Sequence, residues 1–349
     1  MSPRDFETVE LTRGARSGAT MAIAVHSTRL GPALGGARLW RYPGEDAVRL
    51  DAMRLAMAMT SKAAAAGLAL GGGKGAIAWP GEEPPRGEER RAVLLDFADA
   101  VEGLGGRYVT AEDVGTCAAD MVMIRERTSH VVGLPEELGG TGDPSPATAR
   151  GVLAAIAASL EQRFDDPSTV GRRVCLIGAG HVGTHLAHML AEAGADLVIS
   201  DVDPTRRDLA TELDAGWTDP EAAPFEPCDV LAPCALGGVI DSPTATRLRC
   251  AIVCGAANNV LTGDAAADVL QARGILYAPD FIANAGGLIS VYAELRGLDR
   301  EEVLALADGI GGTLRDVYAT STEEQITPLA AAQRIAAGRL ALAPASAAA

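Results

Sequence analysis

With 349 residues the chain is long enough for two domains of ordinary size, and 40 glycines with only 4% aromatic residues favour an α/β protein over an all-β one. A formal net charge of −16 argues against nucleic acid and against an anionic membrane surface as partners. Because the chain has no secretion-signal core, no apolar run of membrane-spanning length and no CxxC pair among its six cysteines, we expect a cytoplasmic protein with reduced thiols.

The first 145 residues or so alternate between strand-like and helix-like patterns. Residues 44–66 carry apolar residues at helical spacing, and the glycine run that precedes residue 74 predicts a turn that leads into a strand. The predicted strands of this region cover residues 21–28, 33–40, 74–79 and 105–113. Gly, Pro, Ser and Asp gather at residues 139–146 and predict a domain boundary.

Beyond residue 172 the alternation of strands and helices becomes regular. The predicted strands cover residues 172–180, 195–203, 228–234, 251–258 and 274–281, and residues 299–341 are predicted to be helical. Short apolar strands separated by helices predict a doubly wound parallel sheet of Rossmann type. We therefore expect an N-terminal α/β domain over 1–145, a Rossmann-type domain over 146–320, and a C-terminal helix and tail over 321–349 whose return to the first domain stays open.

A glycine-rich motif follows the first strand of the second domain. Residues 178–183 read Gly-Ala-Gly-His-Val-Gly, with an apolar strand before them and a helical pattern after them. Gly178 permits a tight turn, Gly180 lets the backbone approach a pyrophosphate, and Gly183 lets the helix pack on the strand. The spacing predicts a dinucleotide site, for which a plain strand–turn–helix is the alternative.

Asp201 ends the next predicted strand, 21 residues after Gly180. In this fold such a carboxylate accepts hydrogen bonds from the adenosine ribose and repels a 2′-phosphate, so we expect NAD. Arg206 and Arg207 lie close by and would suit NADP, but solvated arginines are common one helical turn further on.

Three histidines of the motif helix are spaced in a way that could suggest zinc. His181, His185 and His188 stand at i, i+4 and i+7. Because His181 belongs to the pyrophosphate turn and no cysteine or carboxylate completes a ligand set, we expect no metal.

Only two of the 30 basic residues are lysines, Lys62 and Lys74, and they lie 12 positions apart. Arginine keeps its proton near neutral pH, whereas a lysine that is desolvated or close to another cation can lose it. Two lysines brought together would lower the pKa of at least one of them, as an enzymatic base requires. The alternative is that two surface lysines persist by chance.

Eight motifs together resemble the glutamate/leucine/phenylalanine/valine dehydrogenase family, most closely its phenylalanine and leucine branches. They appear in the family's order between about residues 20 and 300: LGPALGGAR (30–38), SKAAAAGLALGGGKGA (61–76), YVTAEDVGT (108–116), PSPATARGV (144–152), GAGHVG (178–183), APCALGGVI (232–240), GAANNV (255–260) and YAPDFIANAGG (277–287). The resemblance implies a substrate domain followed by an NAD domain, catalysis in the cleft between them, and a homo-oligomer.

The resemblance also implies roles for individual residues. Lys62 matches the lysine that binds the substrate carboxylate, Lys74 matches the catalytic base, and Asp113 matches the carboxylate that exchanges protons with the reacting nitrogen; a helix cap is the alternative for Asp113. Further matches are Thr148 at the nicotinamide amide, Asn258 and Asn284 near the nicotinamide and the substrate amino group, Gly35 and Gly36 at the substrate, and Gly178, Gly180, His181, Val182, Gly183, Asp201 and Ala235 at the cofactor.

The family positions that line the side-chain pocket are apolar in this chain. They correspond to Leu34, Ala111, Leu288 and Val291. Glutamate dehydrogenases carry a third lysine where Leu34 stands, and without it a buried glutamate carboxylate would lack a partner. We therefore expect reversible oxidative deamination of an apolar L-amino acid to its 2-oxo acid and ammonium, with the choice among Val, Leu, Phe and an unusual amino acid left open.

Two other classes of protein remain as alternatives. A non-catalytic NAD-binding module would have no use for a lysine of low pKa, and a hydroxy acid dehydrogenase would need a catalytic His–carboxylate pair. Three of the five histidines lie on the dinucleotide helix, so such a pair has no obvious candidate.

Overall fold

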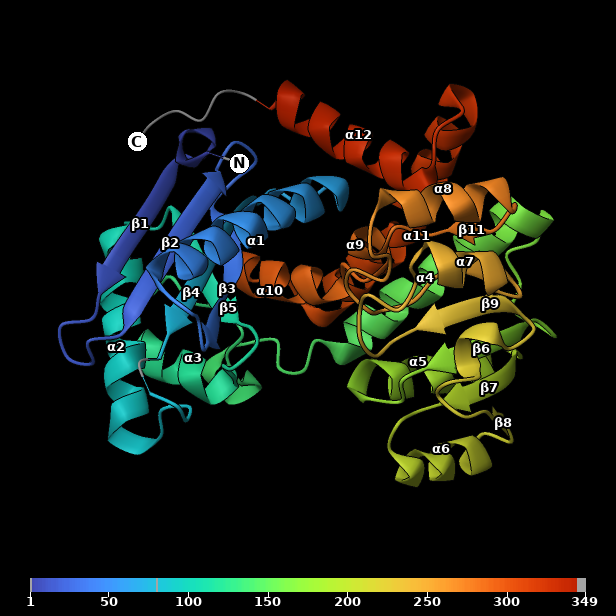
Figure 1. Cartoon of the computed structure of the whole chain (residues 1–349), viewed down its shortest axis with the longest axis horizontal. Helices are drawn as coiled ribbons and strands as arrows, with labels where there is room; N and C mark the ends of the chain where they lie inside the picture. Colours follow the sequence, from blue (N-terminus) through green and yellow to red (C-terminus); the bar gives the residue numbers. More distant parts are fainter. Residues whose placement is uncertain (1, 80, 344–349) are drawn as a thin grey trace. The chain divides into compact units, whose positions relative to one another are not determined.

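The computed structural model describes residues 2–79 and 81–343, which form two compact units. Of the described residues, the first unit contains those up to Gly142, then Val291–Leu298 and residues 336–343; the second contains Asp143–Ser290 and Asp299–Ile335. Each unit has a sheet of its own (Figure 1). We expected the first domain to end at residue 145, three residues after the end of this first stretch of chain. The return of Val291–Leu298 to the first unit was not expected, and the C-terminal return begins at Ala336 instead of 321.

The first unit is built on a five-stranded mixed sheet in the order β1-β2-β4-β3-β5. Its strands are β1 (Thr8–Arg13), β2 (Thr20–Ser27), β3 (Ala33–Trp40), β4 (Gly71–Ala78) and β5 (Tyr108–Glu112). β2 pairs antiparallel with β1 and β4, whereas β3 pairs parallel with β4 and β5. Because β3 lies between β4 and β5, side chains at the ends of these three strands come together.

Helices cover both faces of this sheet. On one face Met21, Ile23 and Val25 of β2 pack with α2 (Gly87–Gly103) and α3 (Ala118–Arg125). On the other face the small side chains of β2 and β4 pack with α1 (Glu45–Ala65). The alternation along β2 therefore places bulky residues under α2 and alanines under α1, so that α1 approaches the sheet closely.

The glycine run at 71–73 lies inside β4, so the predicted turn is wrong. The reason is the tertiary environment of each glycine. A side chain at Gly72 would overlap the backbone of Thr60 on α1, and one at Gly73 would lie 2.5 Å from the Tyr108 ring. The glycines thus allow α1 and β5 to approach the strand that carries Lys74.

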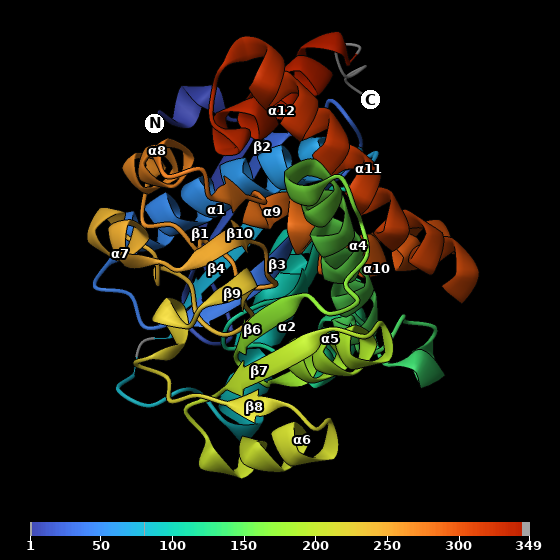
Figure 2. The same ribbon diagram turned by 90° about the vertical axis from the view of Figure 1, so that its right-hand side faces the viewer.

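The second unit contains a parallel six-stranded sheet in the order β11-β10-β9-β6-β7-β8, as the predicted Rossmann-type fold requires. Figure 2 shows β10, β9, β6, β7 and β8 following one another across it. The strands are β6 (Arg173–Ile177), β7 (Asp196–Ser200), β8 (Gly216–Trp217), β9 (Cys228–Pro233), β10 (Cys250–Val253) and β11 (Leu276–Tyr277). Its helices are α4 (Ser145–Phe164), α5 (His181–Glu192), α6 (Arg207–Glu212), α7 (Ser242–Arg247), α8 (Asp264–Ala272), α9 (Asp280–Ala283) and α11 (Arg300–Glu324).

Two helices, α10 (Gly286–Arg296) and α12 (Pro328–Leu342), contribute residues to both units. At the end of α10, the Glu294 carboxylate accepts hydrogen bonds from the backbone N–H groups of Gly133 and Leu134. At the end of α12, Arg339 donates to the carbonyls of Ala64 and Ala65 on α1. Within residues 2–79 and 81–343, no helix is both long enough and apolar enough to cross a membrane.

Candidate active site

Lys74 and Asp113 form a buried ion pair in the first unit. The Lys74 Nζ lies 3.0 Å from Oδ2 of Asp113, and the two side chains are 6% and 22% exposed. Lys74 comes from the middle of β4, whereas Asp113 directly follows β5. Gly36 on β3 makes room for this arrangement, because a Cβ at that position would lie 2.8 Å from Cβ of Asp113.

Burial is the main reason why the pKa of Lys74 lies below its ordinary value of 10.5; the charge of Asp113 opposes this shift, and the charge of Arg38 adds to it. For Asp113, burial raises the pKa, but the charges of Lys74 and Arg38 outweigh it and hold the pKa below its ordinary value. The pair therefore combines an amine that loses its proton more easily than an exposed lysine with a carboxylate that stays ionised.

Arg38, which lies on β3, was not among the site residues predicted from the sequence. Its Nε donates to Oδ2 of Asp113 at 2.8 Å, the same oxygen that Lys74 contacts. The charge of Arg38 is one of the causes that lower the pKa of Lys74. Composition offered no signal for it, because every basic residue other than the two lysines is arginine.

The remaining expected substrate residues of the first unit surround β3 and β5. Leu34, Gly35 and Gly36 lie on β3 in register with Val109, Thr110 and Ala111 of β5. Leu34 and Ala111 are buried, and Lys62 lies in the last turn of α1. Val291 lies on the part of α10 that belongs to this unit. The sheet therefore places Leu34, Gly35, Gly36 and Ala111 on two neighbouring strands, whereas Lys62 and Val291 lie on helices.

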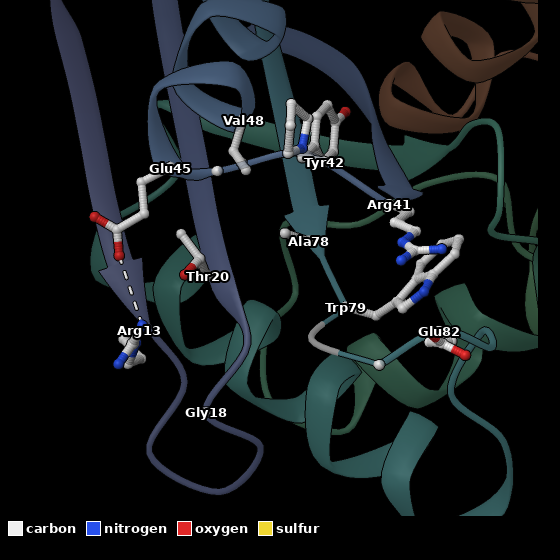
Figure 3. Close-up of a pocket in the computed structure, with 13 residues that line it drawn as sticks. Arg13, Gly18, Thr20, Arg41, Tyr42, Glu45, Val48, Ala78, Trp79 and Glu82 are labelled. Atoms are coloured by element: carbon white, nitrogen blue, oxygen red, sulfur yellow. Dashed lines mark ion pairs between the residues drawn. The ribbon is translucent and has the colours of Figure 1, made fainter.

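A pocket of about 500 Å³ opens elsewhere in the first unit (Figure 3). Arg13 and Glu45 form an ion pair of 3.7 Å on one side of it, and Arg41 lies beside Trp79 on another. None of the residues expected at the active site lines this pocket, whereas Tyr42 does.

In the second unit, the glycine motif forms a tight turn between β6 and α5. Gly178 has a φ of +102°, which suits glycine, and a Cβ there would lie 2.6 Å from Cβ of Ala235. A Cβ at Gly183 would overlap the carbonyl of Gly178, whereas a Cβ at Gly180 would meet nothing within 4 Å. The first and third glycines thus serve packing, and the second leaves the N-terminus of α5 open.

Asp201 holds the glycine turn from the end of β7. Its Oδ2 accepts a hydrogen bond from the backbone N–H of Ala179 at 2.7 Å, and its Oδ1 accepts one from Asp203. His181 and Val182 open α5 next to this turn. Among the described residues, no group of three or more His, Cys, Asp or Glu side chains is arranged to hold a metal ion.

The other second-unit candidates meet near the start of α10. The Asn284 amide donates to Oδ1 of Asn258 at 2.9 Å and to the carbonyl of Ala257. A Cβ at Gly286 would overlap Thr148 on α4, so glycine at this position lets α10 pack against α4. Leu288, two residues further along α10, is buried. The structure thus places Thr148, Asn284 and Leu288 in one region of this unit.

Comparisons with known proteins show the family of this chain. The family model described as "Glu/Leu/Phe/Val dehydrogenase, dimerisation domain" matches residues 7–130, and "Glutamate/Leucine/Phenylalanine/Valine dehydrogenase" matches residues 205–346. A leucine dehydrogenase of Geobacillus stearothermophilus is 41% identical over 97% of this chain and 92% of its own length. A valine dehydrogenase of Streptomyces virginiae is 43% identical over 96% of this chain and 93% of its own length. The chain belongs to the glutamate/leucine/phenylalanine/valine dehydrogenase family.

A solved structure leads to the same family. The L-tryptophan dehydrogenase of Nostoc punctiforme is 34% identical, with a TM-score of 0.86 over 97% of this chain and 96% of its own. These findings confirm the resemblance, the two-domain α/β fold and the enzyme class that the motifs predicted: this member of the family is an amino acid dehydrogenase. They do not test the roles of individual residues.

Proposed function

We propose that this dehydrogenase catalyses the reversible NAD-dependent oxidative deamination of an apolar L-amino acid to its 2-oxo acid and ammonium. The observation that carries the proposal is the buried pair of Lys74 and Asp113. A lysine with a lowered pKa next to an ionised carboxylate is the equipment that hydrolysis of an imine requires.

The second unit fits a dinucleotide. A Cβ at Gly180 would point into open space at the N-terminus of α5, where backbone N–H groups favour an anion. The Asp201 carboxylate accepts backbone hydrogen bonds that hold it in place, and a carboxylate here suits ribose hydroxyls and disfavours a 2′-phosphate. We therefore propose NAD as the cofactor; when bound, NAD would accept the hydride from the substrate Cα, which leaves an iminium.

The first unit supplies the acid–base chemistry. We propose that Lys62 holds the substrate carboxylate, and that Lys74 as the free amine removes a proton from water as the water oxygen bonds to the iminium carbon. Lys74 passes this proton through Asp113 to the nitrogen. Lys74 then takes the proton of the new hydroxyl group as the C=O bond forms and the C–N bond breaks, so that ammonia and the 2-oxo acid leave. Asn258 and Asn284 are proposed to orient the reacting groups by hydrogen bonds.

An apolar substrate is supported by the residues that surround the expected side-chain pocket. Leu34 and Ala111 are buried in the first unit, and Leu288 is buried in the second. A charged substrate side chain beside them would lose its hydration without gaining an ionic partner. The relatives named above are leucine, valine and tryptophan dehydrogenases, all named for apolar amino acids.

The test is the rate of NADH formation at alkaline pH over a panel of Val, Leu, Phe, Trp and Glu, each with NAD and with NADP. We expect turnover with at least one apolar amino acid and NAD, and none with Glu. The matched control is Lys74→Ala, which should bind NADH as the wild type does while losing turnover. A wild-type protein inactive on the whole panel, or a Lys74→Ala variant with near-normal turnover, would refute the proposal.

We also propose a homo-oligomer. Support comes from the description of the N-terminal family model as a dimerisation domain and from β1, whose outer edge pairs with no other strand among the described residues. Light scattering on the purified protein measures the assembly, and a monomer would contradict it. The cytoplasmic location stays a prediction.

A further inference from the structure

Arg38 bridges two aspartates, and one of them belongs to the proposed catalytic pair. Its Nε donates to Oδ2 of Asp113 at 2.8 Å, and its Nη1 donates to Oδ2 of Asp51 at 3.2 Å. The guanidinium is 22% exposed and Asp51 is 17% exposed, so both ends of the bridge are largely withdrawn from water. A planar guanidinium with donors on two edges can span two carboxylates, which the single ammonium of a lysine does less well.

Asp51, on α1, is itself held from two further directions. The hydroxyl of Tyr42 donates to Oδ2 at 2.8 Å, and Arg54 donates to Oδ1 at 2.9 Å. Burial raises the pKa of Asp51, but the hydrogen bonds from Arg54 and Tyr42 and the charge of Arg38 outweigh it. Asp51 therefore remains an ionised anchor for Arg38 at the pH values where the enzyme works.

Residues of this bridge also line a pocket. A pocket of about 550 Å³ is lined by Arg38, Asp51 and Tyr42 together with residues of β3 and α1. Arg38 thus lies between this pocket and Asp113 and does not fill an apolar core. Replacement of Arg38 should therefore act mainly through the loss of its ion pairs and less through the loss of side-chain volume.

Both cations beside Asp113 contact the same oxygen. The shortest contacts of Arg38 and Lys74 with Asp113, 2.8 and 3.0 Å, both end on Oδ2. The charged and titratable groups that act on or feel Asp113 include Lys74 on β4, Arg38 on β3 and the buried Tyr108 on β5, with Asp51 on α1 and Tyr42 behind Arg38. A carboxylate fixed through one oxygen presents the other in a defined direction.

We propose that Arg38 is a positioning residue for the deamination reaction: it fixes Oδ2 of Asp113 against Lys74 and thereby directs Oδ1 to the substrate nitrogen, while Asp51, which Tyr42 holds, anchors its guanidinium. This inference rests on the roles proposed above for Lys74 and Asp113. It adds a second layer of three residues on which the acid–base pair depends.

The chain's two lysines make the test direct. Lysine-selective ¹³C labelling yields two side-chain signals, which a Lys62→Arg sample assigns, and their pH titration reports the pKa of Lys74 without any catalysis. The charge of Arg38 lowers the pKa of Lys74, so Arg38→Gln should raise it. Arg38→Lys keeps a positive charge but cannot span both aspartates, and it should leave the Lys74 pKa closer to that of the wild type.

Kinetics measure the positioning role. In Arg38→Gln we expect kcat to fall by about 10- to 100-fold, the cost of a misplaced catalytic group, and the acid limb of the kcat/KM profile to move to higher pH as Asp113 loses a neighbouring cation. Arg38→Lys and Asp51→Asn should lose less kcat. The KM for NAD, which concerns the other unit, should stay within about twofold in all three variants.

A matched control exists in the same unit. Arg16 also bridges two aspartates, Asp96 and Asp99, through one Nη1. Arg16→Gln removes a comparable bridge and should leave the Lys74 pKa and the pH profile unchanged, even if thermal stability falls. Arg38→Gln should still fold, because Asp113 keeps Lys74 as a partner and Asp51 keeps Tyr42.

The outcomes separate this inference from the proposed function. If the wild type is inactive on every amino acid, the proposed function fails. If the wild type is active and Lys74→Ala is not, but Arg38→Gln keeps the wild-type kcat, pH profile and Lys74 titration, the positioning role fails alone. If Arg16→Gln changed kcat, the pH profile and the Lys74 titration as much as Arg38→Gln does, these changes would reflect general stability. That result would also overturn the positioning role.

Discussion

The two halves of the proposed machinery are built in opposite ways. The dinucleotide turn is local: Gly178, Gly180 and Gly183 lie within six residues, and Asp201 on the adjacent strand ties them down. The acid–base pair is distributed: Lys74 and Arg38 come from two strands, Asp113 follows a third, and Asp51 comes from a helix. One half acts mainly through backbone shape, the other through charges that tertiary packing brings together.

The difference teaches where each half is vulnerable. In the turn, the side chain that glycine lacks decides both packing and access. In the acid–base pair, burial and neighbouring charges decide which group carries a proton. Changes in the dinucleotide turn should affect cofactor binding or stability. Changes around the acid–base pair should affect the chemical step and its pH dependence.

The largest expected effect is on the chemical step. Lys74→Met removes the amine but keeps an unbranched side chain, and Asp113 retains its hydrogen bond from Arg38. We expect kcat to fall by about 10²- to 10⁴-fold with an unchanged dissociation constant for NADH, measured by fluorescence titration. Weakened NADH binding of similar size would mean that the two halves are not separable in this way.

Within the glycine turn, two substitutions of the same size should have different consequences. Gly180→Ala meets open space in the protein, so its thermal stability should match the wild type while KM for NAD rises about tenfold or more. Gly183→Ala would overlap the Gly178 carbonyl and should lower the melting temperature instead. Steady-state kinetics and calorimetry on both variants test this pair, and equal melting temperatures would contradict it.

The coenzyme preference should change when Asp201 loses its charge. In Asp201→Ser, we expect the ratio of kcat/KM for NAD to that for NADP to fall by about tenfold, which corresponds to about 1.4 kcal/mol. The apolar amino acid that the wild type prefers should remain the preferred one, because the first unit is untouched. A ratio that does not move would argue that Asp201 only holds the backbone N–H of Ala179.

The smallest expected effect is a change in the pKa of Lys74. The charge of Asp113 raises the pKa of Lys74, so Asp113→Asn should lower that pKa further, opposite to the effect of Arg38→Gln. Lysine-selective NMR detects it even where turnover is too slow to follow. If the pKa of Lys74 were higher in Asp113→Asn than in the wild type, the charge of Asp113 would not be what stabilises the protonated amine.

Several features could be predicted from sequence because they depend on neighbours along the chain. The strand–turn–helix around Gly178 is one, and the rarity of lysine, which singled out Lys74, is another. The glycines at 71–73 could not be interpreted this way. Their place in β4 follows from contacts with Thr60 and Tyr108, which lie outside their own stretch of chain.

The sequence by itself determined the family, the Rossmann-type unit and the identity of the lysine and aspartate at the proposed centre, since motif order and residue chemistry are properties of the chain. Tertiary structure alone decided that Arg38, one arginine among many, is the cation that shares an oxygen of Asp113 with Lys74. The physical reason is that a charge acts through distance and burial, and both exist only once β3, β4 and β5 have paired.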